Sequence, residues 1–261
     1  MDDRRPLILV TNDDGYQAKG LRKLIALMRT LGDVLAIAPN QVMSAKGHSI
    51  TTTPTLSAVL VEDSPGYREY VLNGTPVDCV KVGYQWILKR LPDVVVSGIN
   101  HGTNASANVV YSGTMGAAIE ACMDGINAIG FSLDSYDLDA DFDHLDPYII
   151  AITKEVLAHG LPEGVCLNVN FPVRSDEPIK GLKVCRQGKA KWIESYGRLQ
   201  DERDDGFLKW GGEFVYEDSG EDTDYEALKN NYITLVPTQF DLTARQYLKA
   251  MGRFEQCINE L

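Results

Sequence analysis

The chain has 261 residues, 44% of them hydrophobic, enough to bury one large core or two small ones. The formal charge of −12 argues against a nucleic-acid polymer or an anionic membrane as the main partner, and no apolar run approaches the roughly 20 residues that span a bilayer. The five cysteines are scattered without a C-x-x-C pair, and the N-terminus has no secretory layout, so we expect a cytoplasmic protein without disulfides or a zinc ribbon.

The first elements in chain order form a strand–helix–strand unit. A short β-prone apolar run at residues 7–11 ends in a strong turn signal at 12–15. Apolar residues then recur at helical spacing as far as Gly32, and residues 34–38 are the next buried run. This order is typical of the start of a parallel α/β sheet.

The middle of the chain continues the alternation of strands and helices. After a loop at residues 41–49, two short strands are predicted at 58–61 and 69–72. Pro76 suits the first turn of a helix that runs to about residue 90. The elements predicted beyond it are strands at 93–97, 126–132 and 165–169 and helices at 113–124 and 145–159.

The character of the sequence changes at about residue 181. Glycines interrupt short β-prone pieces, and no helical period holds for long. We interpret residues 181–231 as a β-rich extension of the same domain, with the acids at 201–205 and 217–226 on exposed faces. A returning strand at 232–236 and a terminal helix are predicted to follow.

Polar clusters follow several predicted strands, at the sheet edge where open α/β folds bind ligands. Asp13 and Asp14 follow the first strand, Ser44 lies in the loop after the second, and Asn100 and Asn104 come after a later one. Adjacent carboxylates repel each other unless something neutralises them, and a hard cation such as Mg²⁺, Mn²⁺ or Ca²⁺ does so. A turn with a helix cap is the alternative interpretation of the first cluster.

A candidate anion site is the helix entry Ser112-Gly113-Thr114. Backbone N–H groups and the positive end of the helix dipole favour phosphate there, although an ordinary serine cap is the simpler interpretation. The sequence contains neither the Rossmann glycine fingerprint nor the Walker lysine loop. It also contains no G-x-S-x-G elbow and no evident Ser–His–Asp arrangement, so covalent acyl chemistry is not expected.

The histidines have simpler interpretations than catalysis. His48 and His101 neighbour the candidate site and are interpreted as supporting or surface residues, whereas His144 and His159 are interpreted as structural. Alternating aspartates at 137–143 lack the glycine and closing glutamate of a calcium loop, so a solvated acidic loop is predicted there.

The motifs, taken in order, resemble the SurE family of 5′-nucleotidases. The matching stretches are ILVTNDDG (8–15), AP…SAKGHSIT (38–51), NGTPVDCV (73–80), PDVVVSGINHGTN (92–104), VYSGTMGAAIEA (110–121), LNVNFP (167–172) and VPTQFDLTA (236–244). The expected fold is a single α/β domain over residues 1–261. It has a Rossmann-like three-layer core with a mainly parallel sheet (about 1–180), a β-rich hairpin arm (about 181–231), and a closing strand and C-terminal helix (about 232–261).

The resemblance implies a phosphatase that hydrolyses nucleoside monophosphates to nucleoside and phosphate, extending in some relatives to 3′-nucleotides and short polyphosphate. It implies one divalent ion per subunit, Mg²⁺ or Mn²⁺ with Ca²⁺ able to occupy the site, held by Asp13, Asp14, Ser44 and Asn100. It implies phosphate contacts from Asn104, Ser112, Gly113 and Thr114. The catalytic residues expected on this basis are Asp13, Asp14, Asn104 and Ser112.

The resemblance also implies homodimers or homotetramers that exchange hairpin arms and C-terminal elements. Two segments depart from the family pattern, with aspartates among residues 221–224 where glycine is usual and Pro-Thr-Gln at 237–239. Both lie outside the metal ligands. They therefore bear on oligomer geometry and substrate choice.

The expected reaction is in-line attack of a metal-activated water on phosphorus. One of the two aspartates can also accept the proton of that water. An aspartyl-phosphate intermediate is the nearest alternative, disfavoured because adjacent acids replace the Asp-x-Asp spacing of such enzymes. A nucleotide- or metal-binding module that senses its ligand without turnover is an alternative of another class.

Overall fold

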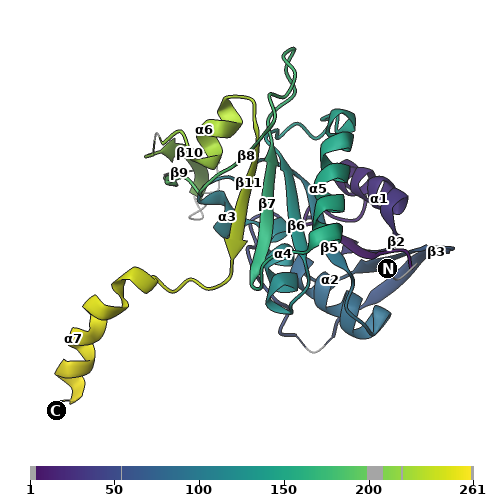
Figure 1. Ribbon diagram of the computed structural model, residues 1–261, viewed down its shortest axis with the longest axis horizontal. Coiled ribbons are helices and arrows are strands. Elements are labelled where there is room, and N and C mark those ends of the chain that lie inside the picture. The colour runs from purple at the N-terminus through teal and green to yellow at the C-terminus, as the bar shows by residue number, and fades with distance from the viewer. Residues whose placement is uncertain (1–3, 54, 199–207, 219, 260–261) are drawn as a thin grey trace.

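One mixed sheet runs through the molecule (Figure 1). The computed structural model describes residues 4–53, 55–198, 208–218 and 220–259. Within these residues the main sheet has nine strands in the order β3-β4-β2-β1-β5-β6-β7-β11-β8. Their bounds are β1 Leu7–Thr11, β2 Asp33–Pro39, β3 Ala58–Ser64, β4 Tyr67–Leu72, β5 Val94–His101, β6 Ala128–Leu133, β7 Val165–Phe171, β8 Leu182–Val184 and β11 Ile233–Gln239.

The centre of this sheet is parallel. Strands β4, β2, β1, β5, β6 and β7 pair in parallel with their neighbours. Antiparallel pairs occur where β3 joins β4 and where β11 joins β7, and β8 then runs parallel to β11. The mainly parallel sheet predicted from the sequence is therefore confirmed.

Helices cover both faces of the sheet and give three layers. Helices α1 (Lys19–Leu31) and α5 (Asp146–His159) pack on one face, and α2 (Pro76–Val82) and α4 (Gly113–Met123) on the other. Alternate residues of β1 serve the two cores, since Ile8 and Val10 join the α1 side and Leu9 the α2 side. All five cysteines are free thiols, and four of them are buried.

The prediction of one helix over residues 76–90 is correct only for the first half of that range. α2 begins with a capping box between Thr75 and Asp78, and Pro76 occupies its first turn as predicted. The chain then continues as one π-helical segment, η1 (Gly83–Leu88), which ends at a left-handed Lys89. Wider turns of this kind are not encoded by a simple apolar period.

β5 is longer than predicted, and this places Asn100 and His101 in the strand instead of the loop after it. The register against β6 shifts between Ser97 and Asn100, after which pairing resumes. Gly98 allows this shift, because its φ is +129° and a Cβ there would lie 2.3 Å from the carbonyl oxygen of Phe131. The strand therefore carries Asn100 to the carboxyl edge of the sheet, where open α/β folds bind ligands.

The extension after residue 181 is less uniformly β than predicted. β8 belongs to the main sheet, β9 (Ala190–Arg198) and β10 (Leu208–Tyr216) form a separate antiparallel hairpin, and a short helix, α6 (Asp224–Lys229), follows. A second short helix that was not predicted, α3 (Asn108–Tyr111), lies beside this hairpin in Figure 1. Helices of four to six residues show too few turns for a period to be recognised.

The prediction that the acids of this extension are exposed is wrong for Asp224. Its side chain is 0% exposed, and its carboxylate accepts the N–H groups of Ser106 (2.7 Å) and Gly188 (2.9 Å). It therefore joins the base of the hairpin to the loop after β5. The acids at 201–205 lie outside the described residues.

The chain leaves the core after β11. A 3₁₀ turn, η3 (Arg245–Tyr247), leads into α7 (Leu248–Asn259), which projects away from the rest of the molecule in Figure 1. No described residue of α7 is buried. A second 3₁₀ turn, η2 (Asp143–Leu145), precedes α5. Among the described helices, none combines the length and apolar character that crossing a bilayer requires.

Candidate functional site

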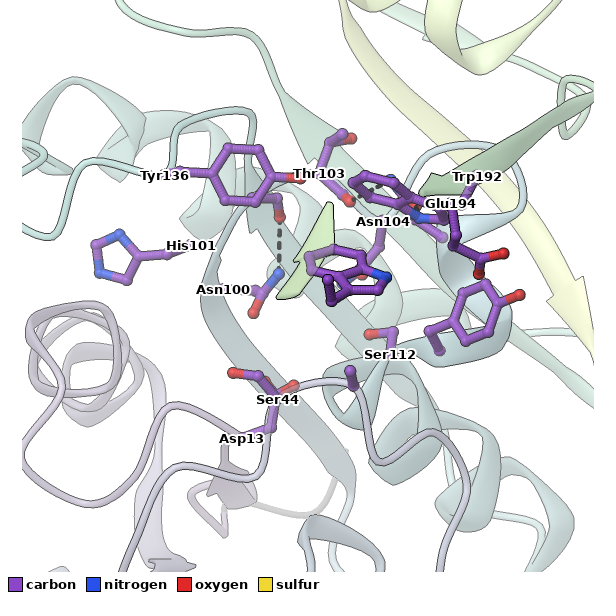
Figure 2. Close-up of a pocket in the computed structure, with 15 residues that line it drawn as sticks. Asp13, Ser44, Asn100, His101, Thr103, Asn104, Ser112, Tyr136, Trp192 and Glu194 are labelled. Carbon is purple, nitrogen blue, oxygen red and sulfur yellow. Dashed lines mark hydrogen bonds between the residues drawn. The ribbon is translucent and has the colours of Figure 1, made fainter. Parts of the chain in front are cut away.

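Five of the predicted site residues line one cavity at the carboxyl ends of β1 and β5 (Figure 2). The cavity has a volume of about 310 Å³, within the usual range for small-molecule sites. The predicted residues among its lining are Asp13, Ser44, Asn100, Asn104 and Ser112. Residues far apart in the sequence thus meet where the topology predicts a ligand.

The other predicted residues lie close by but do not line this cavity. Asp14 lines an adjoining hollow together with Ser44, and its Oδ2 accepts the backbone N–H of His101 at 3.3 Å. Thr114 is buried and its hydroxyl donates to Asp13 Oδ1. Gly113 lies against the same carboxylate, since a Cβ on it would be 2.9 Å from Asp13 Oδ2. Both residues therefore support Asp13 from behind.

Asp13 is the most perturbed acid of the site. Its side chain is 3% exposed. Burial, together with the neighbouring charge of Asp14, raises the pKa of Asp13 to about 6, although the hydrogen bond from Thr114 opposes the shift. Burial also raises the pKa of Asp14. Two carboxylates held in this way favour a cation beside them.

Asn100 presents an oxygen to the same place. Its Nδ2 donates to the carbonyl oxygen of Gly102 at 2.7 Å, so the amide oxygen is the atom left for a ligand. Figure 2 shows the Asn100 side chain beside the end of the cavity that holds Asp13 and Ser44, with a dashed line for this hydrogen bond. The imidazole of His101 points away from the cavity in the same view and packs edge-on against Phe142. Burial lowers the pKa of His101.

The loop that carries Ser44 is fastened at three points. The N–H of Met43 donates to the carbonyl of Asp13 at 2.7 Å, and the N–H of Gly47 to that of Tyr111 at 3.0 Å. His48 Nε2 lies 2.7 Å from the buried carboxylate of Glu120 on α4. His48 therefore supports this loop, as the sequence analysis expected of a residue near the site.

These side chains fit a hard divalent cation. The donors are two carboxylates, a hydroxyl and an amide oxygen, all of them oxygen ligands of the kind that Mg²⁺ and Mn²⁺ take. Across the described residues no group of three or more His, Cys, Asp or Glu side chains gathers for a metal. A cation here would therefore depend on Ser44 and Asn100 as well as on the aspartates.

The side-chain charge of the cavity is acidic in the part of the chain that the structure describes. Among the described residues that line it, none is Lys or Arg, whereas Asp13 and Glu194 are acidic. An anionic ligand would meet only negative side-chain charge there. A bound cation would reverse the local sign, which is the usual solution in phosphate sites.

Two hydrogen-bond donors line the same cavity, Ser112 and Asn104. Ser112 caps α4 by accepting the N–H of Met115 at 3.0 Å, which leaves its own hydroxyl hydrogen to donate. Asn104 donates one amide hydrogen to Ser132 Oγ at 2.8 Å and retains the other. The serine cap expected from the sequence is present, and the same residue lines the cavity.

Two asparagines of β7 support the site and were not assigned a role from the sequence. Asn170 Oδ1 accepts the N–H of Asn104 (2.7 Å) and the hydroxyl of Thr103 (3.1 Å). Asn168 Nδ2 donates to the carbonyl of Asn104 at 2.9 Å. The signal was the i, i+2 spacing of two amides in an otherwise apolar strand, which puts both on one face of the sheet.

We predict that Asn170→Ala lowers both stability and turnover. The change leaves the buried N–H of Asn104 and the Thr103 hydroxyl without their acceptor, a loss of about 2–3 kcal/mol in unfolding free energy. Chemical denaturation measures the stability, and release of phosphate, the reaction that the family resemblance implies, measures the turnover. Asn127→Ala is the matched control, because Asn127 accepts the N–H of Leu161 at the opposite end of the sheet. It should lose stability and keep its kcat/KM; equal kinetics in both variants would contradict the assignment.

The hairpin contributes residues that the sequence analysis missed. Trp192 and Glu194 of β9 and Trp210 of β10 line the cavity together with Tyr111 and Tyr136. Nothing in the sequence pattern shows which way a hairpin folds back. The available signal was the presence of two tryptophans, Trp192 and Trp210, in an otherwise polar, glycine-rich segment.

Comparison with known proteins adds a family and a set of relatives. Residues 8–194 match the model of the family described as Survival protein SurE. The 5′-nucleotidase SurE of Flavobacterium psychrophilum is 51% identical over 252 residues, 96% of this chain and 98% of the relative. That of Chlorobium luteolum is 34% identical over 253 residues, 97% of each chain. The crystal structure of the SurE protein from Aquifex aeolicus superposes with a TM-score of 0.80 at 36% identity, covering 96% of this chain and 100% of that one.

Proposed function

The chain belongs to the SurE family, and from that premise we propose that it is a divalent-metal-dependent phosphatase that converts nucleoside monophosphates to nucleoside and inorganic phosphate. Support comes from relatives named as 5′-nucleotidases that match almost end to end. The proposal includes activity on 3′-monophosphates and short polyphosphate.

The observation that carries the metal dependence is the charge of the cavity. Its described lining offers acidic side chains and no Lys or Arg, so a phosphate dianion needs a cation to bind. We propose that Asp13, Asp14, Ser44 and Asn100 hold one Mg²⁺ or Mn²⁺, with Ca²⁺ able to replace it. When bound, such an ion supplies positive charge for the phosphate and lowers the pKa of a water.

The protein groups have separate roles in this proposal. Asp13, whose carboxylate accepts the hydroxyl of Thr114, is held in place as a metal ligand at its end of the cavity. The hydroxyl of Ser112 and the second amide hydrogen of Asn104, which line the same cavity, donate to phosphoryl oxygens. These donors are anchored by their own hydrogen bonds, so they need little reorganisation as charge develops in the transition state.

We propose that the protein acts in the cytoplasm as a homodimer or homotetramer. Five free thiols fit a reducing compartment. The exposed apolar residues of α7, a helix in which no described residue is buried, suit an interface with another copy; they are Leu248, Met251, Phe254 and Ile258.

Phosphate release from a panel of substrates tests the proposed reaction. The panel holds 5′- and 3′-nucleoside monophosphates and short polyphosphate, each with Mg²⁺, with Mn²⁺ and with excess chelator. We expect release from 5′-monophosphates that needs the metal and is lost on chelation. Release that persists in chelator contradicts the metal dependence, and a phosphorylated protein trapped by acid quench would favour the aspartyl-phosphate route. Folded protein that binds nucleotide without release would instead be a sensor.

A further inference from the structure

One end of the cavity is built from aromatic side chains. Trp192 of β9 and Trp210 of β10 line it, together with Tyr111, the last residue of α3. Figure 2 shows Trp192 and Glu194 at the far side of the cavity from Asp13 and Ser44. The cavity therefore has an acidic, oxygen-rich end and an aromatic end.

Trp192, at the aromatic end, is anchored by the protein. Trp192 Nε1 donates to Asn108 Oδ1 at 3.2 Å, and the ring packs against Phe214 at a centroid distance of 5.2 Å. Trp210 lies 6.1 Å from Trp192 with the ring planes inclined by 51°. A ring anchored as Trp192 is loses little entropy when a flat ligand binds.

These rings nevertheless leave much apolar surface uncovered. Trp210 is 58% exposed and Tyr111 52%. Large rings directed into a cavity are stabilised when a ligand covers them. The neighbouring carboxylate of Glu194 accepts hydrogen bonds when ionised, so it favours a ligand that carries hydroxyl or amino donors over a string of phosphates.

We propose that Trp192 and Trp210 form a stacking subsite for the base of a nucleoside monophosphate, with Glu194 accepting from its sugar hydroxyls or exocyclic amine. This inference rests on the proposed phosphatase function for the placement of the phosphate at the Asp13 end. Every base has a π face, so the subsite accepts any base. It favours purines, which offer the larger face. Glu194 and the rings together select nucleotides over polyphosphate.

The first test compares two substrates with the same phosphate ester, adenosine 5′-monophosphate and ribose 5-phosphate. Stacking on one aromatic ring is worth about a factor of ten. Trp210→Ala should lower kcat/KM for adenosine 5′-monophosphate about tenfold, mainly through KM, and leave ribose 5-phosphate unchanged. Trp192→Phe, which keeps an aromatic ring, should have a smaller effect in the same direction. Trp86→Phe, in a separate hollow beside Leu56 and Val82, is the control and should change neither.

The second test does not depend on turnover. The chain has three tryptophans, so after Trp86→Phe both remaining indoles lie in the cavity. Adenosine, which has no phosphate, should quench their fluorescence in chelator, and the added change Trp210→Ala should weaken its apparent affinity about tenfold.

The outcomes separate the subsite from the phosphatase function. If Trp210→Ala lowers kcat/KM equally for both substrates, or for neither, the stacking subsite is overturned while the phosphatase function stands. If no phosphate is released from any substrate, the phosphatase proposal fails, and quenching by adenosine decides the subsite. Quenching weakened by Trp210→Ala supports it, and absence of quenching overturns it.

Discussion

Replacing Asp13 with asparagine is expected to lower metal-dependent phosphate release by about a thousandfold or more. The change removes a negative charge from the proposed metal ligands but keeps the size of the side chain and its hydrogen bond from Thr114. Initial rates over a range of Mn²⁺ concentrations measure the effect. Turnover close to that of the unchanged protein would show that the proposed metal site is wrong.

The same change should stabilise the metal-free protein above neutral pH. The folded state raises the pKa of Asp13 from 3.8 to about 6, so it binds the proton more tightly than the unfolded chain does. The protonated carboxyl of Asp13 therefore contributes to the free energy of unfolding, by at most about 3 kcal/mol. This contribution is present below about pH 4 and is lost as the pH rises through about 6. Asp13→Asn should therefore raise Tm at pH 8 in chelator and change it little at pH 4.

A matched aspartate separates these effects from a general loss of charge. Asp93 precedes β5 at the opposite end of the sheet, where it accepts the N–H of Leu7 at 2.6 Å. Asp93→Asn should keep the activity and should not raise Tm at pH 8. A gain in Tm in this control, or none with Asp13→Asn, would contradict the link between burial of Asp13 and its function.

The layers and the acidic end of the site could be predicted because they depend on local patterns. A buried run followed by Asn-Asp-Asp-Gly identifies both β1 and the position of Asp13. Asn100 was predicted in the loop after β5 but lies within the strand, because the register shift at Gly98 extends β5 beyond residue 97. Such a shift depends on the close approach of Phe131 from another strand, which no local pattern shows.

The supports of the site could not be predicted because they come from distant segments. Asn170 reaches Asn104 across 66 positions, and Trp192 reaches Asn108 across 84. Both contacts follow from which strands are neighbours and from the direction in which the hairpin returns. A motif can mark a residue as present at the site, but its hydrogen-bond partner is fixed only by the topology.

The second large effect on activity is expected at Gly113, where α4 begins beside the carboxylate of Asp13. Gly113 opens α4, and a Cβ there would lie 2.8 Å from Asp13 Cβ and 2.9 Å from its Oδ2. Gly113→Ala must therefore displace the carboxylate or the start of the helix. Because a shift of about 1 Å at a reacting group can reduce turnover about a hundredfold, kcat/KM should fall by about that factor.

The loss of activity should exceed the loss of stability. Overpacking costs about 1–3 kcal/mol, and the higher helix propensity of alanine returns about 1 kcal/mol of it. Gly252→Ala in α7, where nothing lies within 4 Å of the added methyl group, is the control and should keep full activity. Denaturation curves and metal titrations for both variants distinguish the causes. A Gly113→Ala protein that unfolds in buffer would point to a packing role alone, whereas a folded protein with weakened Mn²⁺ affinity would show that the glycine leaves room for the carboxylate proposed to hold the metal.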